Sequence, residues 1–349
     1  MIKKYNSYRQ FKLLSVRVFL QSSLFLFICM INISCKKDVP INLQEINTKP
    51  YVLNIPNGFP YPDIPSDNPL TQDKINLGKQ LFFDPILSRD STVACGSCHQ
   101  PNKNFTDNLT ISVGINGRIG TRNAPSLMNI AYAPYLFWDG GNPTLEQQVL
   151  GPINNHNEMD YDVNKIVTRL LRHPTYPALF QKAFKEPPSV FALTRAIACY
   201  ERILLSANSR FDDYLMNNDT NALTTSEKKG FAIFTGEKGD CFHCHAEYNF
   251  TDYSFRNNGL YSIYADSGRA RITQKPSDYG KFKVPSLRNI EKTAPYMHDG
   301  SLATLADVVN HYNTGGKPSA TKDFLIKPLN LTIQEQQDLV NFLKCLTDK

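Results

Sequence analysis

Two five-residue segments have a spacing that suits one kind of cofactor attachment. They are Cys95-Gly96-Ser97-Cys98-His99 and Cys241-Phe242-His243-Cys244-His245. In a Cys-x-x-Cys-His segment, both thiols add to the vinyl groups of one porphyrin and the following His ligates the iron. The chain is therefore predicted to bind two haem c groups covalently. Cys95, Cys98 and His99 would hold the first haem, and Cys241, Cys244 and His245 would hold the second.

A zinc site and a redox-active Cys pair are the alternatives for each segment. Zinc would need further Cys or His ligands at a matching spacing, and a thioredoxin-like pair needs no following His. Chance gives one match more easily than two in a chain with eight Cys. His243 is interpreted as a surface residue, because His245 already supplies the ligand.

The amino terminus predicts export and a lipid anchor. Residues 1–34 carry five Lys and Arg, no acid, and an apolar run from Val18 to Ile33, as a secretory signal does. Ser34-Cys35 resembles the end of a lipoprotein signal, although Asn32 stands where Leu is usual. We expect residues 1–35 to be a signal peptide, and Cys35 to anchor the protein in the periplasm or at the outer membrane. Ordinary cleavage and a retained anchor are the alternatives.

The positive charge of the chain comes mainly from this terminus. The net charge is +6, and removing residues 1–34 leaves about +1, so the charge indicates no nucleic-acid partner. With 349 residues, of which 41% are hydrophobic, the chain is long enough for two ordinary domains.

The pattern of the chain predicts a mainly α fold. Residues 36–70 are rich in Pro and Asn and predict an irregular tether. Helices are expected from Thr71, as a cap, to Phe83, over 163–172, 176–184 and 189–205, and from Ser226. No segment has a convincing sheet pattern. We place one haem domain at 71–220 and the other at 221–349.

An internal repeat relates the two halves. Residues 124–130 match 284–290, and Asp139-Gly140 matches Asp299-Gly300. In this register Trp138 corresponds to His298, and Pro152 to Tyr312. A phenol can ligate ferric iron but proline cannot, so the second iron is predicted to be capped by Tyr312 and the first to be open. The alternatives are that Tyr312 packs or bonds to a propionate, or that its neighbour His311 is the ligand.

A carboxylate follows Pro152 in the sequence. Splitting a peroxide heterolytically requires a group that moves a proton from the near oxygen to the departing one, and Glu158 suits that role. The alternative is that Glu158 is an exposed surface residue.

These segments resemble the bacterial di-haem cytochrome c peroxidase family, which includes MauG, over roughly residues 60–347. Further matching segments are 122–126, 137–140, 151–154, 281–289 and 294–300. The resemblance implies two cytochrome c-like haem domains in tandem, with the active site near their interface. The N-terminal domain would be peroxidatic, and the C-terminal domain would transfer electrons.

The resemblance also implies roles for single residues. Trp138 would be the electron bridge between the haems, and Glu158 the acid/base residue at the peroxide site. The side chain of Asn123, with the backbone carbonyls of Thr293 and Pro295, would hold a Ca²⁺ ion.

Two positions differ from the standard peroxidases. Ile115 stands where those enzymes cap the peroxidatic iron with a His, and isoleucine cannot ligate. Tyr312 stands where they place Met on the second iron, as in MauG, and a phenolate favours ferric iron. The first haem is therefore expected to be open without reductive activation.

The expected function is a periplasm-facing peroxidase that reduces hydrogen peroxide. A small redox protein or quinol would donate electrons, which pass from the C-terminal haem to the open N-terminal haem. The first alternative is peroxide-dependent oxidation of a protein or organic substrate by long-range electron transfer. The second is a pure electron carrier, which Pro152, Ile115 and Glu158 argue against. The resemblance also allows a homodimer, because many members of this family dimerise.

Cys199 and Cys345 lie outside the haem segments and the signal. They are expected to form either a disulfide or two separately buried thiols.

Overall fold

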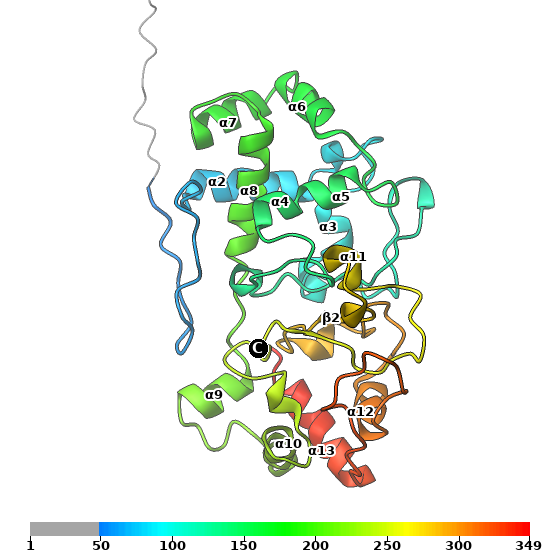
Figure 1. Ribbon diagram of the computed structural model, residues 1–349. Coiled ribbons are helices and arrows are strands. Elements are labelled where there is room, and N and C mark those ends of the chain that lie inside the picture. Colours follow the sequence, from blue (N-terminus) through cyan, green and yellow to red (C-terminus); the bar gives the residue numbers. More distant parts are fainter. Residues whose placement is uncertain (1–48) are drawn as a thin grey trace, which may run out of the picture. The chain divides into compact units, whose positions relative to one another are not determined.

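The computed structural model describes residues 49–349, and helices dominate this part of the chain (Figure 1). The signal peptide, Cys35 and the first part of the tether lie outside the described residues. Residues 49–70 contain no helix. Among residues 49–349, no helix combines the length and the apolar composition needed to cross a bilayer.

The first group of helices surrounds one hydrophobic core. It contains α2 (Gln72–Phe83), α6 (Val163–Leu171), α7 (Tyr176–Phe184) and α8 (Val190–Arg202). The predicted cap of α2 is confirmed, because the Thr71 hydroxyl accepts a hydrogen bond from the Lys74 N–H at 3.3 Å. Helix α8 is shorter than the expected 189–205. The Leu204 carbonyl accepts from the Asn129 N–H at 2.7 Å instead of continuing the helix.

The second group of helices surrounds a separate core. It contains α9 (Arg210–Met216), α10 (Thr225–Thr235), α12 (Leu305–Asn313) and α13 (Ile333–Lys344). In this core the Phe211 ring packs against the rings of Phe231, Phe250 and Phe342. Helix α9 thus packs with the second core, although it precedes the expected domain boundary at residue 220.

A glycine allows the main helix pair of each core to pack closely. A Cβ at Gly78 of α2 would lie 1.8 Å from the Ala196 carbonyl oxygen of α8. A Cβ at Gly230 of α10 would lie 2.0 Å from the Asp338 carbonyl oxygen of α13. In each half, the helix that precedes the Cys-x-x-Cys-His segment therefore packs closely on its partner helix at a glycine.

The remaining elements are short. They are α3 (Cys95–Cys98), α4 (Leu145–Gln148), α5 (Leu150–Asn154), α11 (Ala270–Thr273) and the antiparallel strands β1 (Phe255–Arg256) and β2 (Phe282–Lys283). Turns of 3₁₀ helix lie at Pro85–Leu87, Pro101–Lys103, Ile115–Gly117, Ile130–Tyr132, Cys241–His243, Pro276–Asp278 and Ile290–Lys292. Within residues 49–349 the only sheet is therefore this two-stranded one.

The internal repeat extends to the backbone. Asn129 and Asn289 both have positive φ angles, of 60° and 59°, and each precedes a 3₁₀ turn. Thr144 caps α4, and Thr304 caps α12 in the same register. This register places Pro152 in α5 and Tyr312 in α12.

One buried serine joins the two copies of the repeat. The Ser206 N–H donates to Asn129 Oδ1 at 2.8 Å, and Asn129 Nδ2 donates to the Ser206 carbonyl at 2.8 Å. Asn289 Nδ2 donates to Ser206 Oγ at 2.6 Å. We call Asn129, Ser206 and Asn289 the asparagine clasp. Its Ser206 lies between α8 and α9, in the segment that connects the two cores.

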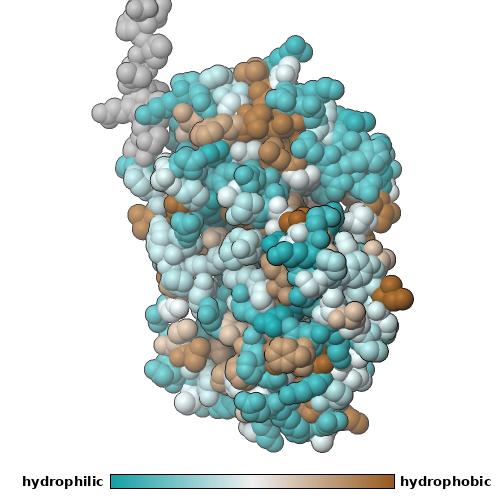
Figure 2. Space-filling view, viewed as in Figure 1, coloured by the Kyte–Doolittle hydropathy of each residue, from teal (hydrophilic) through white to brown (hydrophobic). Residues whose placement is uncertain are grey.

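Apolar side chains on the face shown in Figure 2 form small patches between hydrophilic residues. The largest fully buried side chains, Tyr176, Phe82, Phe180 and Phe342, lie in the two cores.

Candidate haem sites

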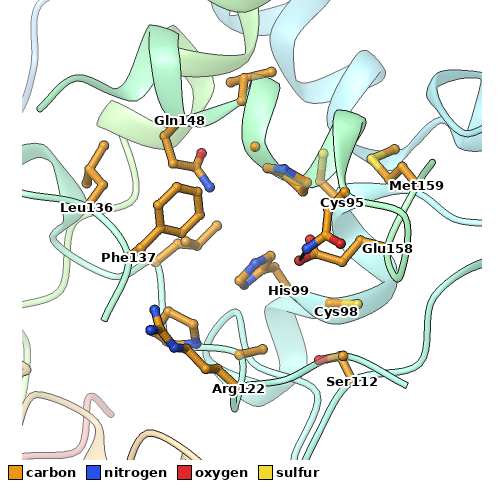
Figure 3. A pocket seen from close by; sticks show the side chains of 18 of the residues that line it. Cys95, Cys98, His99, Ser112, Arg122, Leu136, Phe137, Gln148, Glu158 and Met159 are labelled. Atoms are coloured by element: carbon orange, nitrogen blue, oxygen red, sulfur yellow. Dashed lines mark hydrogen bonds between the residues drawn. The ribbon is translucent and has the colours of Figure 1, made fainter. Parts of the chain in front are cut away.

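The first Cys-x-x-Cys-His segment borders a cavity of about 330 Å³. Helix α3 places Cys95 and Cys98 on one turn, and both thiols and His99 line this cavity (Figure 3). His99 Nδ1 donates to the Phe105 carbonyl at 2.8 Å, which leaves Nε2 for a metal. Burial lowers the pKa of His99, so the imidazole is neutral, as a metal ligand must be.

The second segment repeats this geometry without an α-helical turn. Residues Cys241–His243 form a 3₁₀ turn, and His245 Nδ1 donates to the Phe250 carbonyl at 2.9 Å. Burial lowers the pKa of His245 as well. The two histidines that are predicted to ligate iron are thus held in the same tautomer, each by a backbone carbonyl of a following Phe.

The four thiols of these segments fit covalent haem attachment. All four are free of disulfides. Burial raises the pKa of Cys98 to about 11 and that of Cys241 to about 12, so neither is a reactive thiolate. Within residues 49–349 no three His, Cys, Asp or Glu side chains are placed to share a metal ion, which disfavours the zinc interpretation.

The cavity of the first segment also contains the residues expected at the peroxide face. Pro152 and Glu158 both line it, as His99 does, and Figure 3 labels Glu158 and His99 among the lining residues. Burial raises the pKa of Glu158, against the lowering effect of a hydrogen bond from Asn155 Nδ2 at 2.6 Å. Glu158 is half-buried in the cavity wall, and the alternative of a fully exposed surface residue is wrong.

Ile115 lies in the loop that the sequence predicted to bring no ligand to the first iron. Its side chain is fully buried and is not among the residues that line the cavity. Its N–H donates to the Glu158 carbonyl at 2.9 Å. This approach requires Gly114, since a Cβ there would lie 2.1 Å from the Asn157 carbonyl oxygen. The loop therefore supports Glu158 and brings no ligating side chain into the cavity.

Trp138 contacts both halves of the chain. Its indole lines the first cavity, and Nε1 donates to the Asn123 carbonyl at 2.9 Å. Its carbonyl accepts from the Lys283 N–H of β2 at 2.7 Å, and its side chain packs against the small buried cluster of Leu260, Tyr264 and Phe282. His298, the repeat counterpart of Trp138, is buried and stacks on Phe282 with ring centroids 3.7 Å apart.

Tyr312 of α12 lies close to the second segment. Burial raises its pKa to about 12, and the nearby thiols of Cys244 and Cys241 add to the rise. The phenol therefore keeps its proton at neutral pH unless a cation at its oxygen displaces it. Asn258, which sequence reasoning missed, donates from Nδ2 to the Tyr312 hydroxyl at 3.4 Å.

The neighbours of Tyr312 limit the alternatives for the second ligand. His311 Nε2 donates to the Asn258 carbonyl at 3.1 Å, so this nitrogen is already used. The Met297 sulfur accepts from Asn258 Nδ2 at 3.2 Å. Met297 therefore lies next to Tyr312, a proximity that the sequence did not predict.

The loops that would hold calcium lie against each other. Asn108 Nδ2 donates to the carbonyls of Lys292 and Ala294 at 2.8 Å each. Asn123 uses its amide nitrogen on the Leu109 carbonyl at 2.9 Å. Among the described residues, no hydrogen bond reaches Asn123 Oδ1 or the carbonyls of Thr293 and Pro295. These three oxygens are therefore free to bind a cation.

An ion-pair network that the sequence did not predict borders the first cavity. Arg122, which lines the cavity, donates to both carboxylate oxygens of Asp266 at 2.6 and 2.9 Å and to Asp139 at 2.7 Å. Arg271 also lines the cavity and pairs with Asp139. The repeat of Asp139-Gly140 as Asp299-Gly300 was the available sequence signal for Asp139.

Cys199 and Cys345 are two separately buried thiols. Both are free. The Cys199 thiol donates to Asn68 Oδ1 at 3.3 Å, whereas Cys345 belongs to the second core. The disulfide alternative is wrong.

Comparisons with known proteins point to one group. A family model described as di-haem cytochrome c peroxidase matches residues 72–220. The methylamine utilization protein MauG of Methylorubrum extorquens is 39% identical over 295 residues, which cover 83% of this chain and 82% of that protein. The cytochrome c551 peroxidase of Nitrosomonas europaea is 35% identical over 294 residues, which cover 82% and 84%.

A solved structure has the same fold. It is a MauG-like protein associated with microbial copper homeostasis, 38% identical to this chain, with a TM-score of 0.80. The match covers 86% of this chain and 96% of that one.

Proposed function

Because this chain belongs to the di-haem cytochrome c peroxidase family, we propose that it reduces hydrogen peroxide at the first haem site with electrons that enter through the second. The family consists of oxidoreductases, and the chain is an enzyme of the cytochrome c peroxidase type. The observation that carries the proposal is a cavity lined by Cys95, Cys98 and His99 that also contains Pro152 and Glu158. His99 would ligate the iron of a haem held in this cavity, Pro152 has no side chain that could ligate iron, and Glu158 would supply an acid/base group.

The chain supplies the proton chemistry of this reaction. Bound haem would supply an iron that takes a peroxide oxygen and exchanges electrons. Glu158 would accept the proton of the near peroxide oxygen and return it to the departing oxygen, which leaves as water. Two electrons and two further protons complete the conversion of one peroxide to two waters. The raised pKa of Glu158 suits a group that must both take and release a proton near neutral pH.

Trp138 and Tyr312 would have different roles, one in electron transfer between the haem sites and the other in ligation of the second iron. Trp138 lines the first cavity and packs against the buried cluster of Leu260, Tyr264 and Phe282 in the second half, which supports its role as the electron bridge. Tyr312 would ligate the second iron and keep that site closed to peroxide. Its place beside Cys241 and Cys244 supports this role.

A Ca²⁺ ion would fix the interface between these sites. The three free oxygens of Asn123, Thr293 and Pro295 are the hard ligands that calcium prefers. Asn123 is also bonded to Trp138 through its carbonyl, so bound calcium would hold the electron bridge in place.

The decisive test uses the haem-loaded, fully oxidised protein mixed with one equivalent of peroxide and no reductant. Stopped-flow absorbance and EPR are expected to show a fast change from a high-spin ferric start. If no reaction occurs until one electron is added, a distal ligand caps the first iron and the open-site proposal fails. Steady-state turnover with peroxide and a reduced cytochrome then tests peroxidase activity itself.

Oxidation of a protein or organic substrate is the second candidate. The similarity to MauG of Methylorubrum extorquens and the presence of Tyr312 favour it. This function also predicts a fast reaction with peroxide, but little turnover with reduced cytochromes. The two candidates are therefore distinguished by the steady-state assay.

The location and association of the protein complete the proposal. We place it in the periplasm or at the outer membrane, anchored through Cys35, with a small redox protein or quinol as donor. Cys35→Ser is expected to move the protein from the membrane to the soluble fraction of the cell envelope. An unchanged membrane fraction would exclude the lipid anchor. Analytical ultracentrifugation would show whether it forms a homodimer.

A further inference from the structure

A second carboxyl group, that of Glu201, is enclosed in the first cavity. Glu201 lies in the last turn of α8, is 4% exposed and lines the cavity. Its Oε2 atom is buried without a hydrogen-bond partner. No role described above uses this side chain.

The cation next to Glu201 does not neutralise it. The Arg202 guanidinium donates to both carboxylate oxygens of Glu146 of α4, at 2.6 and 2.9 Å. Glu146 also accepts from Asn68 Nδ2 at 2.7 Å. The nearest ion pair is therefore complete without Glu201, and Glu146 adds a negative charge on that side.

The other charged groups of the cavity do not neutralise Glu201 either. From α3 it is faced by the Cys95 thiol, which haem attachment would convert to an uncharged thioether. Glu158, on the same cavity wall, is another acid. The cations Arg122 and Arg271 are engaged with Asp139.

An unpartnered anion is strongly disfavoured at such a buried place. Burial raises the pKa of Glu201 to about 8, and the charge of Glu146 adds to the rise against the effect of Arg202. At neutral pH Glu201 is therefore a neutral carboxylic acid inside the cavity.

We propose that Glu201 is the proton-binding group that accompanies electron uptake in the first haem cavity. An added electron increases the affinity of nearby groups for a proton, and the buried Oε2 atom of Glu201 has no hydrogen-bonded cation that would hold the anion in place. Where Glu201 is ionised, the addition of one electron at the iron would be accompanied by the binding of one proton from solvent to the Glu201 carboxylate. The charge of the cavity then stays constant. The proposal rests on haem occupancy but not on peroxide turnover.

The pH dependence follows from this assignment. Below about pH 8 Glu201 is protonated in both redox states, so electron uptake binds no proton there. Above that pH, Glu201 is ionised only in the oxidised protein, and reduction takes up a proton. At a fixed applied potential, the ratio of reduced to oxidised first haem should then fall by up to tenfold per pH unit.

A redox titration of the haem-loaded protein tests the proposal without peroxide. The native protein is compared with Glu201→Gln and with Glu158→Gln, which removes the other acid of the same cavity. Glutamine keeps the shape of the protonated acid but cannot ionise. Above about pH 8, the ratio of reduced to oxidised first haem at a fixed potential should fall with pH in the native protein and in Glu158→Gln. This slope should be absent in Glu201→Gln. A slope that persists in Glu201→Gln, or disappears in Glu158→Gln, would overturn the proposal.

A second measurement on the native protein does not depend on any variant. Infrared difference spectra between the reduced and oxidised protein above about pH 8 should gain a protonated-carboxyl C=O band that shifts in D₂O. The absence of this band refutes the assignment. Failure of the peroxidase function would instead appear in turnover with peroxide, which neither measurement uses.

Discussion

Replacing Glu158 by Gln removes the group that we propose transfers the proton, and it leaves the hydrogen bonds that hold this loop in place. The Glu158 N–H donates to the Asn155 carbonyl at 3.0 Å, and the Glu158 carbonyl accepts from the Ile115 N–H at 2.9 Å. Both are backbone bonds that Gln keeps. A Gln oxygen can also accept from Asn155 Nδ2, as Glu158 Oε1 does at 2.6 Å. The loop should therefore stay folded, and the change in rate should report chemistry alone.

The size of the effect follows from the role. A positioned acid/base group contributes about 10²–10⁴ in rate, which is about 3–5 kcal/mol of barrier. We expect the second-order rate of the oxidised protein with peroxide to fall by that factor in Glu158→Gln. The native rate should also fall at acid pH, with a midpoint above the ordinary Glu value of about 4.3, because burial raises the pKa of Glu158.

Stopped-flow absorbance over a range of peroxide concentrations and pH measures both effects. Glu237→Gln is the matched control, because Glu237 is exposed and lies in the second half of the chain. Its rates should equal those of the native protein. A loss of less than tenfold in Glu158→Gln, or an unchanged acid limb in that variant, would refute the proton-transfer role.

Three further predictions concern the second haem, the interface and the fold. Tyr312→Met replaces a hard phenolate by a soft thioether, so the potential of the second haem should rise in spectroelectrochemistry, and an unchanged potential would contradict ligation by Tyr312. Chelation with EGTA should lower the melting temperature of the native protein but not that of Asn123→Ala; equal shifts in both would exclude this calcium site. The pKa of Asp212 is lowered by its bonds to Arg288, at 2.9 Å each, despite burial. This pair therefore stabilises the fold above about pH 4 and is lost as pH falls through the folded pKa. Asp212→Asn should cost about 3 kcal/mol in denaturant unfolding at pH 7 but little at acid pH, and a cost independent of pH would refute this account.

Local spacing predicts the parts of the haem sites that depend on neighbouring residues. The two thiols and the ligand of each segment follow from five consecutive residues, and the cap at Thr71 from the next turn. The place of Tyr312 in α12 follows from the register of the repeat, which the positive φ angles of Asn129 and Asn289 preserve. These features are specified within a few residues or by direct comparison of the two halves.

Contacts between distant segments could not be predicted in this way. Arg122 and Asp266 are 144 positions apart, and Asn258 and Tyr312 are 54 apart, so neither pair has a signature in the sequence. Glu201 reads as an ordinary polar residue near the end of a helix. Its carboxyl group lacks an ion-pair partner because the guanidinium of Arg202 is hydrogen-bonded to Glu146 on α4, which is distant in the sequence. The sequence predicted that helix α8 would reach residue 205. The Leu204 carbonyl instead accepts a hydrogen bond from the Asn129 N–H, which belongs to a distant segment of the chain.

The asparagine clasp limits how far the duplicated halves can be separated. The repeat provides two asparagines, but the linker provides one Ser206 between them. A half expressed alone would keep one asparagine with a buried amide and no counterpart from the other half, which is costly. Separating the copies would therefore lower the stability of the half that loses Ser206. Asn129 Nδ2 also donates to Asn249 Oδ1 of the second half at 3.0 Å, so buried hydrogen bonds through both Ser206 and Asn249 tie the two copies together.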